Sequence, residues 1–364
     1  MDPALVFRLL VAAPGYQPRV VSKVDPASGL VTVKLDRQDT ARLGPKNKLL
    51  GRVLDPQGRP VHGAEVDFES LDFEGGGGVG GAVEGVEQVA MTDAQGQFLL
   101  ASKKSFAAMS VTVIAPSLAK QRFASLASGR QHELRLSRGN ALAGRLVLGN
   151  KPVAGATVGL VGADRSIERS IGNFVTVSDA QGRFVFSNLP PNNACSVYTL
   201  MCEARANGGV APARKCKIGP DGATTDIGDL VLEPAFRVAG KVVLSDGKPV
   251  PKGQRAMLDR AEAWDFLPNV DLAADGSFVF EGVPAESVSL SVNVPDYHFS
   301  LSNPSLDRLN GFSVVGRVSG NLDGLLVLQE PGEFKRDANR PYSLDDQPRD
   351  KPLRGLPAER LPRR

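Results

Sequence analysis

The stretch that decides the fold reads GRVLDPQGRPVHGAEVDF over residues 51–68 and resumes as TDAQGQFLL over residues 92–100. The first segment holds two apolar stretches joined by a turn, and the second is a turn followed by alternating apolar residues. Both recur twice in the same order, with opening glycines 93 and 96 residues apart. The chain is therefore built from a repeated unit. The other copies read GRLVLGNKPVAGATVGLVG (144–162) with SDAQGRFVFSNLP (178–190), and GKVVLSDGKPVPKG (240–253) with AADGSFVFEGVP (273–284).

Each copy of the second segment predicts a tight turn and a half-buried strand. In the first copy, Asp93 can bond the backbone of its own turn, and Gly96 supplies a positive φ. The alternation that follows places a phenylalanine two residues after each turn glycine. Phe98, Phe184 and Phe278 are therefore predicted to be equivalent core residues. Many short strands separated by regular turns are typical of a β-sandwich.

The pattern G-x-V-x-x-x-x-G-x-P-V-x-G-A-x-V, followed by T-D-x-x-G-x-F, resembles the carboxypeptidase regulatory-like domain, a transthyretin-like (prealbumin-like) module. The resemblance covers about residues 47–331. It implies an all-β chain of tandem seven-stranded Greek-key transthyretin-like β-sandwich modules with no catalysis of their own. The third copy departs from the pattern, because Pro251-Lys252-Gly253 stands where Gly-Ala is usual. The matching residues are Gly51, Gly58, Pro60, Val61, Gly63, Ala64, Val66, Thr92, Asp93, Gly96 and Phe98 in the first copy, and Gly144, Pro152, Val153, Gly155, Ala156 and Val158 in the second.

The repeat divides the chain into five parts. Residues 1–46 match the C-terminal half of a transthyretin-like module. Because a half-sandwich exposes unpaired strand edges, we expect sequence upstream of Met1, or a partner, to supply the missing strands. The complete modules are predicted at 47–138, 139–235 and 236–331, the last being divergent, and residues 332–364 are predicted to be a disordered Pro/Arg-rich tail.

Composition argues against several classes of function. The net charge is +3, and residues 331–364 alone carry that excess, so the rest of the chain lacks the basic face that nucleic acids require. A single Trp and four Tyr provide few platforms for stacking. No Cys/His spacing suggests zinc, and no apolar run approaches the roughly 20 residues that span a bilayer. Residues 4–13 resemble a signal-peptide core, but Asp2 and Arg8 favour an ordinary strand.

Residues with chemically versatile side chains do not form an obvious catalytic or metal site. His62, His132 and His298 belong to different places in the modules, so a shared site is not expected. A single Asp per hairpin turn supplies too few oxygens for calcium. The glycine run at 75–81 is interpreted as a flexible loop, since a dinucleotide site needs a strand before it and a helix after it. We predict neither a catalytic residue nor a bound cofactor or metal.

Two local features remain, one as a possible ligand contact and one as a possible disulfide. Trp264, with Asp265 and Phe266 beside it, lies on a loop of the third module, where an exposed aromatic could contact a sugar ring or a protein partner. Packing of this loop over its own core is the alternative. Cys202 and Cys216 flank an Asn-Gly-Gly turn signal and are predicted to face each other across a hairpin, where they could form a disulfide and leave Cys195 unpaired.

The predicted function is that of a non-catalytic structural or interaction array, a spacer or adhesive arm of an extracellular or cell-envelope protein. Two alternatives stay open: an array of carbohydrate-binding modules, and an accessory region of a secreted peptidase whose catalytic domain lies outside this chain. A protein or glycan partner is expected, without nucleic acid and without a transmembrane segment. Because tandem modules contact mainly their neighbours, each module is expected to unfold nearly independently.

Overall fold

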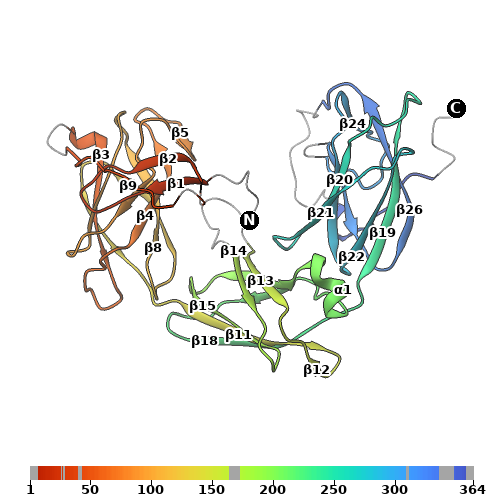
Figure 1. The fold of residues 1–364 in the computed structure, drawn as a ribbon, viewed down its shortest axis with the longest axis horizontal. Helices are drawn as coiled ribbons and strands as arrows, with labels where there is room; N and C mark the ends of the chain where they lie inside the picture. Colours follow the sequence, from red (N-terminus) through yellow and green to blue (C-terminus); the bar gives the residue numbers. More distant parts are fainter. Residues whose placement is uncertain are drawn as a thin grey trace.

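The computed structural model describes residues 7–25, 27, 29–39, 43–163, 173–308, 311–335 and 348–357. The described chain is all-β, and its strands form small sheets that pack in pairs as tandem β-sandwich modules. Figure 1 shows the modules in chain order, with the first and third at the two ends and the second between them. The helices within these ranges are only a few residues long, and none could cross a membrane.

The first module has a central strand, β3, that pairs with β7 in the antiparallel sense and with β10 in the parallel sense. The opposite sheet has the order β5-β4-β8-β9, with β6 also paired to β4. The core lies between these sheets. The strands are β3 (Lys48–Leu54), β4 (Glu65–Asp72), β5 (Gly78–Gly80), β6 (Val89–Met91), β7 (Gln97–Ala101), β8 (Ala108–Ile114), β9 (Gln121–Ala127) and β10 (Gln131–Arg135).

The second module repeats this pairing around β11, which lies between antiparallel β15 and parallel β18. Its other sheet has the order β14-β13-β16-β17, so β17 is an edge strand. A 3-10 turn, η3 (Met201–Glu203), and one helical turn, α1 (Ala204–Asn207), separate β16 from β17. The strands are β11 (Asn140–Leu148), β12 (Lys151–Pro152), β13 (Thr157–Gly162), β14 (Asn173–Val177), β15 (Arg183–Leu189), β16 (Ala194–Thr199), β17 (Arg214–Lys217) and β18 (Thr224–Val231).

The third module has the same arrangement around β19, with antiparallel β22 on one side and parallel β26 on the other. The departure of its sequence at 251–253 therefore leaves the central pairing unchanged. Its sheets have the orders β22-β19-β26-β24 and β21-β20-β23-β25. The strands are β19 (Phe236–Leu244), β20 (Arg255–Arg260), β21 (Phe266–Asp271), β22 (Ser277–Val283), β23 (Ser287–Val292), β24 (Tyr297–Phe299), β25 (Ser313–Arg317) and β26 (Leu322–Pro331).

The N-terminal segment lies against the first module. β1 (Phe7–Val11) and β2 (Arg19–Val24) form an antiparallel hairpin, and Tyr16 forms a bridge with Arg37. Gln38 donates a hydrogen bond of 2.6 Å to the Glu87 carboxylate of the first module. Burial raises the pKa of Glu87, and the same carboxylate also accepts the Ala101 amide at 2.8 Å.

Part of the C-terminal segment that the sequence predicts to be disordered packs on the third module. The amide of Arg317 donates to the carbonyl of Lys351 at 2.6 Å, and the amide of Leu353 returns a bond to Arg317 at 2.9 Å. The amide of Leu356 donates to Leu326 at 3.0 Å. Composition predicted disorder because apolar residues are sparse here, but Leu353 and Leu356 are each only 4% exposed. The prediction is thus wrong for residues 348–357; the rest of the segment beyond residue 335 lies outside the described residues.

The cysteine pairing predicted from sequence is also wrong. The register between β16 and β17 places Cys195, not Cys202, opposite Cys216. Cys202 is exposed on η3. The prediction assumed one continuous hairpin around the Asn-Gly-Gly signal, whereas the chain after β16 winds into η3 and α1. Gly208, with φ +76°, ends that helical turn instead of forming a two-residue hairpin loop.

Candidate functional site: a buried polar junction between two modules

β20 directs a charged side chain into the protein interior. Ala256, Leu258 and Arg260 alternate along this strand, and all three are buried. The side chain of Arg260 is 0% exposed. A buried cation is tolerated only where it is paired and its N–H groups have acceptors. The groups around this guanidinium therefore define the site.

Two buried carboxylates of the third module pair with this guanidinium. Glu286, just before β23, accepts two parallel hydrogen bonds, from Nε to Oε1 at 2.6 Å and from Nη2 to Oε2 at 2.8 Å. Asp265, just before β21, accepts Nη1 of Arg260 on Oδ2 at 3.3 Å. The two-pronged contact with Glu286 fixes the orientation of the guanidinium plane as well as its position.

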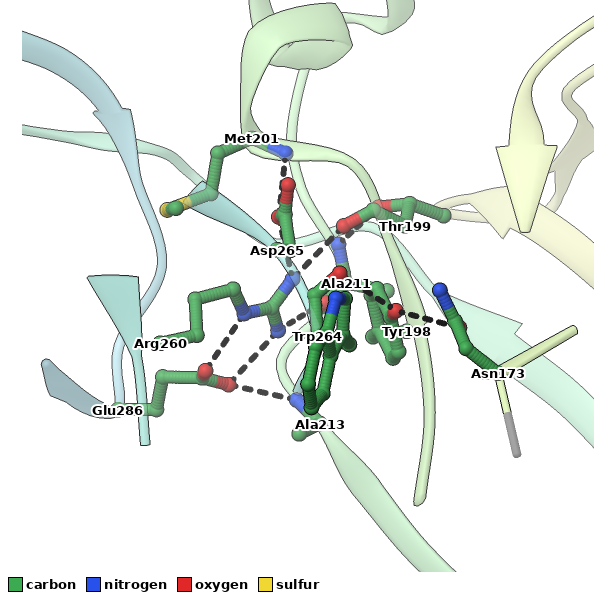
Figure 2. A network of polar contacts seen from close by, with 10 residues as sticks. All are labelled: Asn173, Tyr198, Thr199, Met201, Ala211, Ala213, Arg260, Trp264, Asp265 and Glu286. Atoms are coloured by element: carbon green, nitrogen blue, oxygen red, sulfur yellow. Dashed lines mark hydrogen bonds and ion pairs between the residues drawn. The ribbon is translucent and has the colours of Figure 1, made fainter. Parts of the chain in front are cut away.

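The remaining guanidinium contacts cross into the second module, as Figure 2 shows. Nη1 of Arg260 donates to the carbonyl of Thr199 at 2.7 Å, and Nη2 donates to the carbonyl of Ala211 at 3.1 Å. Thr199 ends β16, and Ala211 follows α1. The charge of the third module is thus partly solvated by backbone dipoles of the second.

The carboxylates make the complementary contacts to backbone amides of the second module. The amide of Ala213 donates to Oε2 of Glu286 at 2.6 Å, and the amide of Met201 donates to Oδ2 of Asp265 at 2.9 Å. The two acids outnumber the single guanidinium, so these amides help to balance the buried negative charge. Burial raises the pKa of Asp265, while the Met201 amide and the Arg260 guanidinium act in the opposite direction.

An aromatic ring completes the polar network. The ring of Tyr198 is fully buried, and the guanidinium carbon of Arg260 lies 5.1 Å from its centroid, a cation–π distance. The Tyr198 hydroxyl donates to the carbonyl of Trp264 at 3.0 Å, which is a further bond from the second module to the third. Its oxygen also lies 3.5 Å from Oδ1 of Asn173 on β14 (Figure 2).

A few apolar residues of the second module extend the core of the third beside this network. Met201, Ala204 and Val210 of the second module belong to the hydrophobic cluster of the third. Gly282 lies close to the second module: its φ is +89°, and a Cβ there would lie 2.6 Å from the carbonyl oxygen of Met201. A larger residue at this position would push the modules apart.

The boundary between the first and second modules is different. Neither hydrophobic cluster contains a residue of the other module, since their members lie at 49–136 and 142–232 respectively. Hollows of about 490 and 520 Å³, lined mainly by turn and loop residues of both modules, lie at this boundary. The boundary between the first and second modules therefore contains solvent-accessible hollows, whereas the boundary between the second and third is packed with buried side chains.

The network can hold two modules together, but its geometry offers no reactive group. The charged atoms are engaged with one another or with backbone groups, and the surrounding side chains are buried. In the described part of the chain, no His, Cys, Asp and Glu side chains gather into a group of three or more that could hold a metal ion. The charged groups of this site are thus used in contacts within the third module and between the second and third modules.

The loop predicted from sequence as a ligand contact is divided between two environments. Asp265 is buried and is part of the junction, whereas Trp264 and Phe266 are each 58% exposed. The carbonyl of Trp264 accepts the Tyr198 bond while its side chain remains at the surface. A ligand contact by the two aromatic side chains remains a prediction.

The central residues of the junction were missed in the sequence, although one signal was present. The alternation of Ala256 and Leu258 places Arg260 on the inward face of its strand, and an inward arginine requires buried partners. Tyr198 lies in a strand whose residues are all buried after the first, so no alternation distinguishes it. Glu286 carries no such pattern, because it precedes its strand and its partners, Arg260 and the Ala213 amide, are distant in sequence.

No protein-family profile matches this chain, and no curated protein is significantly similar in sequence. Solved structures that match this chain include the Bacillus anthracis TIE protein, with 12% identity and a TM-score of 0.22. That match covers 78% of this chain and 50% of the TIE chain. A streptococcal ancillary pilin is 11% identical, with 78% of this chain and 99% of that chain covered and a TM-score of 0.28. A minor pilin of Streptococcus agalactiae is 10% identical, with 56% and 100% covered and a TM-score of 0.30. Similarities this low carry no inference about function.

Proposed function

We propose that this chain is a non-catalytic structural arm of an extracellular or cell-envelope protein, in which the second and third modules form one rigid body. The buried junction around Arg260 carries the proposal. Two modules joined by a flexible linker would not keep charged side chains buried against each other. An arm that holds a fixed geometry can use such contacts to fix the orientation of its modules. The inter-module bonds involve both backbone and side chains, so they fix rotation as well as separation.

Energetics support rigidity at this boundary. Removing one partner of a buried ion pair typically costs about 3–5 kcal/mol, because the other charge is left buried without compensation. Separating the modules would remove the second-module partners of Arg260, Glu286 and Asp265 together. Opening would exchange these bonds for bonds to water and would expose Met201, Ala204 and Val210, and the exposure of this apolar surface opposes opening. Within the described residues no such junction joins the first module to the second, so we expect the orientation of the first module to vary.

Distance distributions between spin labels on unnatural amino acids test the proposal without relying on the native cysteines. One pair, at Arg145 and Lys252, spans the second and third modules, and a second pair, at Lys104 and Arg145, spans the first and second; all three positions are exposed. We expect a narrow distribution for the first pair and a broader one for the second. Equally broad distributions would contradict a rigid second boundary.

The variant Arg260→Ala should broaden the distribution across the second boundary. Arg255→Ala is a matched control, because Arg255 lies on the same strand but forms an exposed ion pair with Asp271 at 2.8 Å. The control should leave the distribution unchanged. Hydrogen exchange of β20 in both variants checks that the third module remains folded. An Arg260→Ala protein with a folded third module and an unchanged narrow distribution would remove the basis for the proposal.

A second function, adhesion through an aromatic contact, is compatible with the first. Trp264 and Phe266 are two residues apart and equally exposed, so a sugar ring or an apolar protein surface could rest on them. A glycan array and a pull-down with the purified chain should then give signals that Trp264→Ala and Phe266→Ala each abolish. Signals that survive both substitutions, or no signal at all, would exclude this loop as the adhesive site.

A further inference from the structure

We propose that Cys195 and Cys216 form a disulfide that fastens the edge strand β17 to β16. The two residues are direct partners in the antiparallel register, and their Sγ atoms lie 3.0 Å apart. Opposed residues in antiparallel strands have Cα atoms about 4.5–5.5 Å apart, within the separation that a disulfide bridges. The strands need not move for the bond to form.

The two thiols have different environments, which sets the order of reaction. Cys195 is fully buried in the core of the second module, and Cys216 is partly exposed on the edge strand. The hydrogen bond between the two sulfurs lowers the pKa of Cys216, and the nearby Arg214 acts in the same direction. The same hydrogen bond, followed by burial, raises the pKa of Cys195. Cys216 is therefore the thiolate that reacts first.

The reaction balances with a small disulfide such as oxidised glutathione as the oxidant. The Cys216 thiolate attacks one glutathione sulfur, which forms a mixed disulfide and releases one glutathione thiolate. Cys195 then loses its proton and attacks Sγ of Cys216, which releases the second glutathione. The protein loses two electrons and two protons, and one oxidised glutathione becomes two reduced molecules.

Cys202 has the opposite character. It is exposed on η3, outside the paired strands. Partial desolvation of its sulfur and the negative charges of Asp265 and Glu203 raise its pKa. Under conditions that form the disulfide between Cys195 and Cys216, we expect Cys202 to stay a thiol or to form a mixed disulfide with glutathione. No neighbouring cysteine would displace that glutathione.

The experiment incubates the full chain with oxidised glutathione, quenches with acid, alkylates the free thiols and maps the peptides without reduction. Trypsin alone leaves Cys195 and Cys202 in one peptide, residues 184–205, so both assignments would give the same linked mass. Chymotrypsin cleavage after Tyr198 separates them. We expect Cys195 and Cys216 to lose alkylation together as one linked product, and oxidation to increase the hydrogen-exchange protection of β17.

Three variants make the outcome decisive. Cys202→Ser should leave the linked product unchanged, whereas Cys195→Ser and Cys216→Ser should each abolish it. Two results would overturn the proposal. In the first, both Cys195 and Cys216 can still be alkylated after the oxidation; in the second, the disulfide joins Cys202 to Cys216. Because the pair lies wholly within the second module, this result is independent of whether the junction around Arg260 is rigid.

Discussion

At the scale of single residues, the repeated glycines and phenylalanines occur together for a steric reason. Gly51, the opening glycine of the first copy, lies opposite Phe98 in the register of β3 and β7. A Cβ on Gly51 would lie 2.4 Å from the phenylalanine ring. Gly144 with Phe184, and Gly240 with Phe278, form the same pairs, each with a corresponding distance of 2.6 Å. The ring crosses the central strand where that strand has no side chain.

A double-mutant cycle on the first pair measures this coupling. Phe98→Ala should lower the free energy of unfolding of the first module by about 3–5 kcal/mol, and Gly51→Ala by about 1–3 kcal/mol through overpacking. In the double variant the added methyl group enters space that the ring has left. The combined loss should therefore be smaller than the sum by about 1 kcal/mol or more, as measured by urea unfolding. Gly320→Ala, where a Cβ meets nothing within 4 Å, should combine additively with Phe98→Ala.

The pH dependence of the first module is expected to depend on Asp67 of β4. Burial, together with the negative charges of Glu65 and Glu69, raises its pKa to about 7, although Lys120 acts against the shift. The folded state then keeps a proton that the unfolded state, with the ordinary value of 3.8, releases. Stability should fall as the pH rises from about 4 to about 7 and then level off, since the folded state binds more protons in that window.

Asp67→Asn should remove this part of the pH dependence. After allowance for solvent screening, we expect the variant to gain about 1–2 kcal/mol relative to the wild type between pH 4 and pH 8. Urea midpoints across that range provide the measurement. Asp72→Asn, at the exposed end of the same strand, serves as the control. Parallel curves for wild type and Asp67→Asn would show that this carboxyl titrates normally.

At the scale of elements, the segment at 348–357 completes the third module. It runs beside β25 through a parallel bridge between Arg317 and Pro352, and Leu353 joins the hydrophobic cluster of that module. Gly355 lies so close to β26 that a Cβ would be 2.3 Å from the Leu326 amide nitrogen. A segment of low apolar content can thus be held by a few buried leucines and backbone bonds.

Leu353→Ala is expected to lower the unfolding free energy of the third module by about 2 kcal/mol, the low end for a buried leucine, because this peripheral segment can detach separately. Hydrogen exchange at the Arg317 amide should accelerate, since that amide donates to Lys351. Lys351→Ala, which removes only an exposed side chain, is the control. Unchanged exchange at Arg317 in Leu353→Ala would show that the leucine does not hold the segment.

At the scale of the whole molecule, the modules are not energetically alike. Each module has a core of its own, but three residues of the second also belong to the core of the third, and the buried junction links these two modules. The independence expected from the repeat is therefore revised to a prediction of two cooperative units. The first unit is the first module, and the second is the joined pair.

Calorimetry of three equivalent variants distinguishes these schemes. Phe98→Ala should shift only the transition of the first module. Phe184→Ala and Phe278→Ala should both shift one common transition, because unfolding either module exposes the charges and the apolar surface that the other covers. In Arg260→Ala the common transition should separate into two. Three separate transitions in the wild-type protein, each moved by its own variant, would instead support independent modules.

The sequence by itself determined what depends on local pattern. Period-two alternation and the Asp-x-x-Gly turns predicted an all-β chain of sandwiches, and they identified Phe98, Phe184 and Phe278 as core residues, all of which are buried. Turn chemistry and alternation act over a few residues, so they can be read without knowing what packs opposite. The inward position of Arg260 was encoded in the same way.

Only the tertiary structure decided which groups meet across modules and across η3. The partners of Arg260 include carbonyls of Thr199 and Ala211, and a backbone carbonyl has no sequence signature. The pairing of Cys195 with Cys216 depended on where β16 ends and the helical turn begins, which shifts the strand register. The packing of residues 348–357 likewise depended on a surface formed elsewhere in the chain. Contacts of this kind arise from the meeting of distant segments, and local propensity does not specify them.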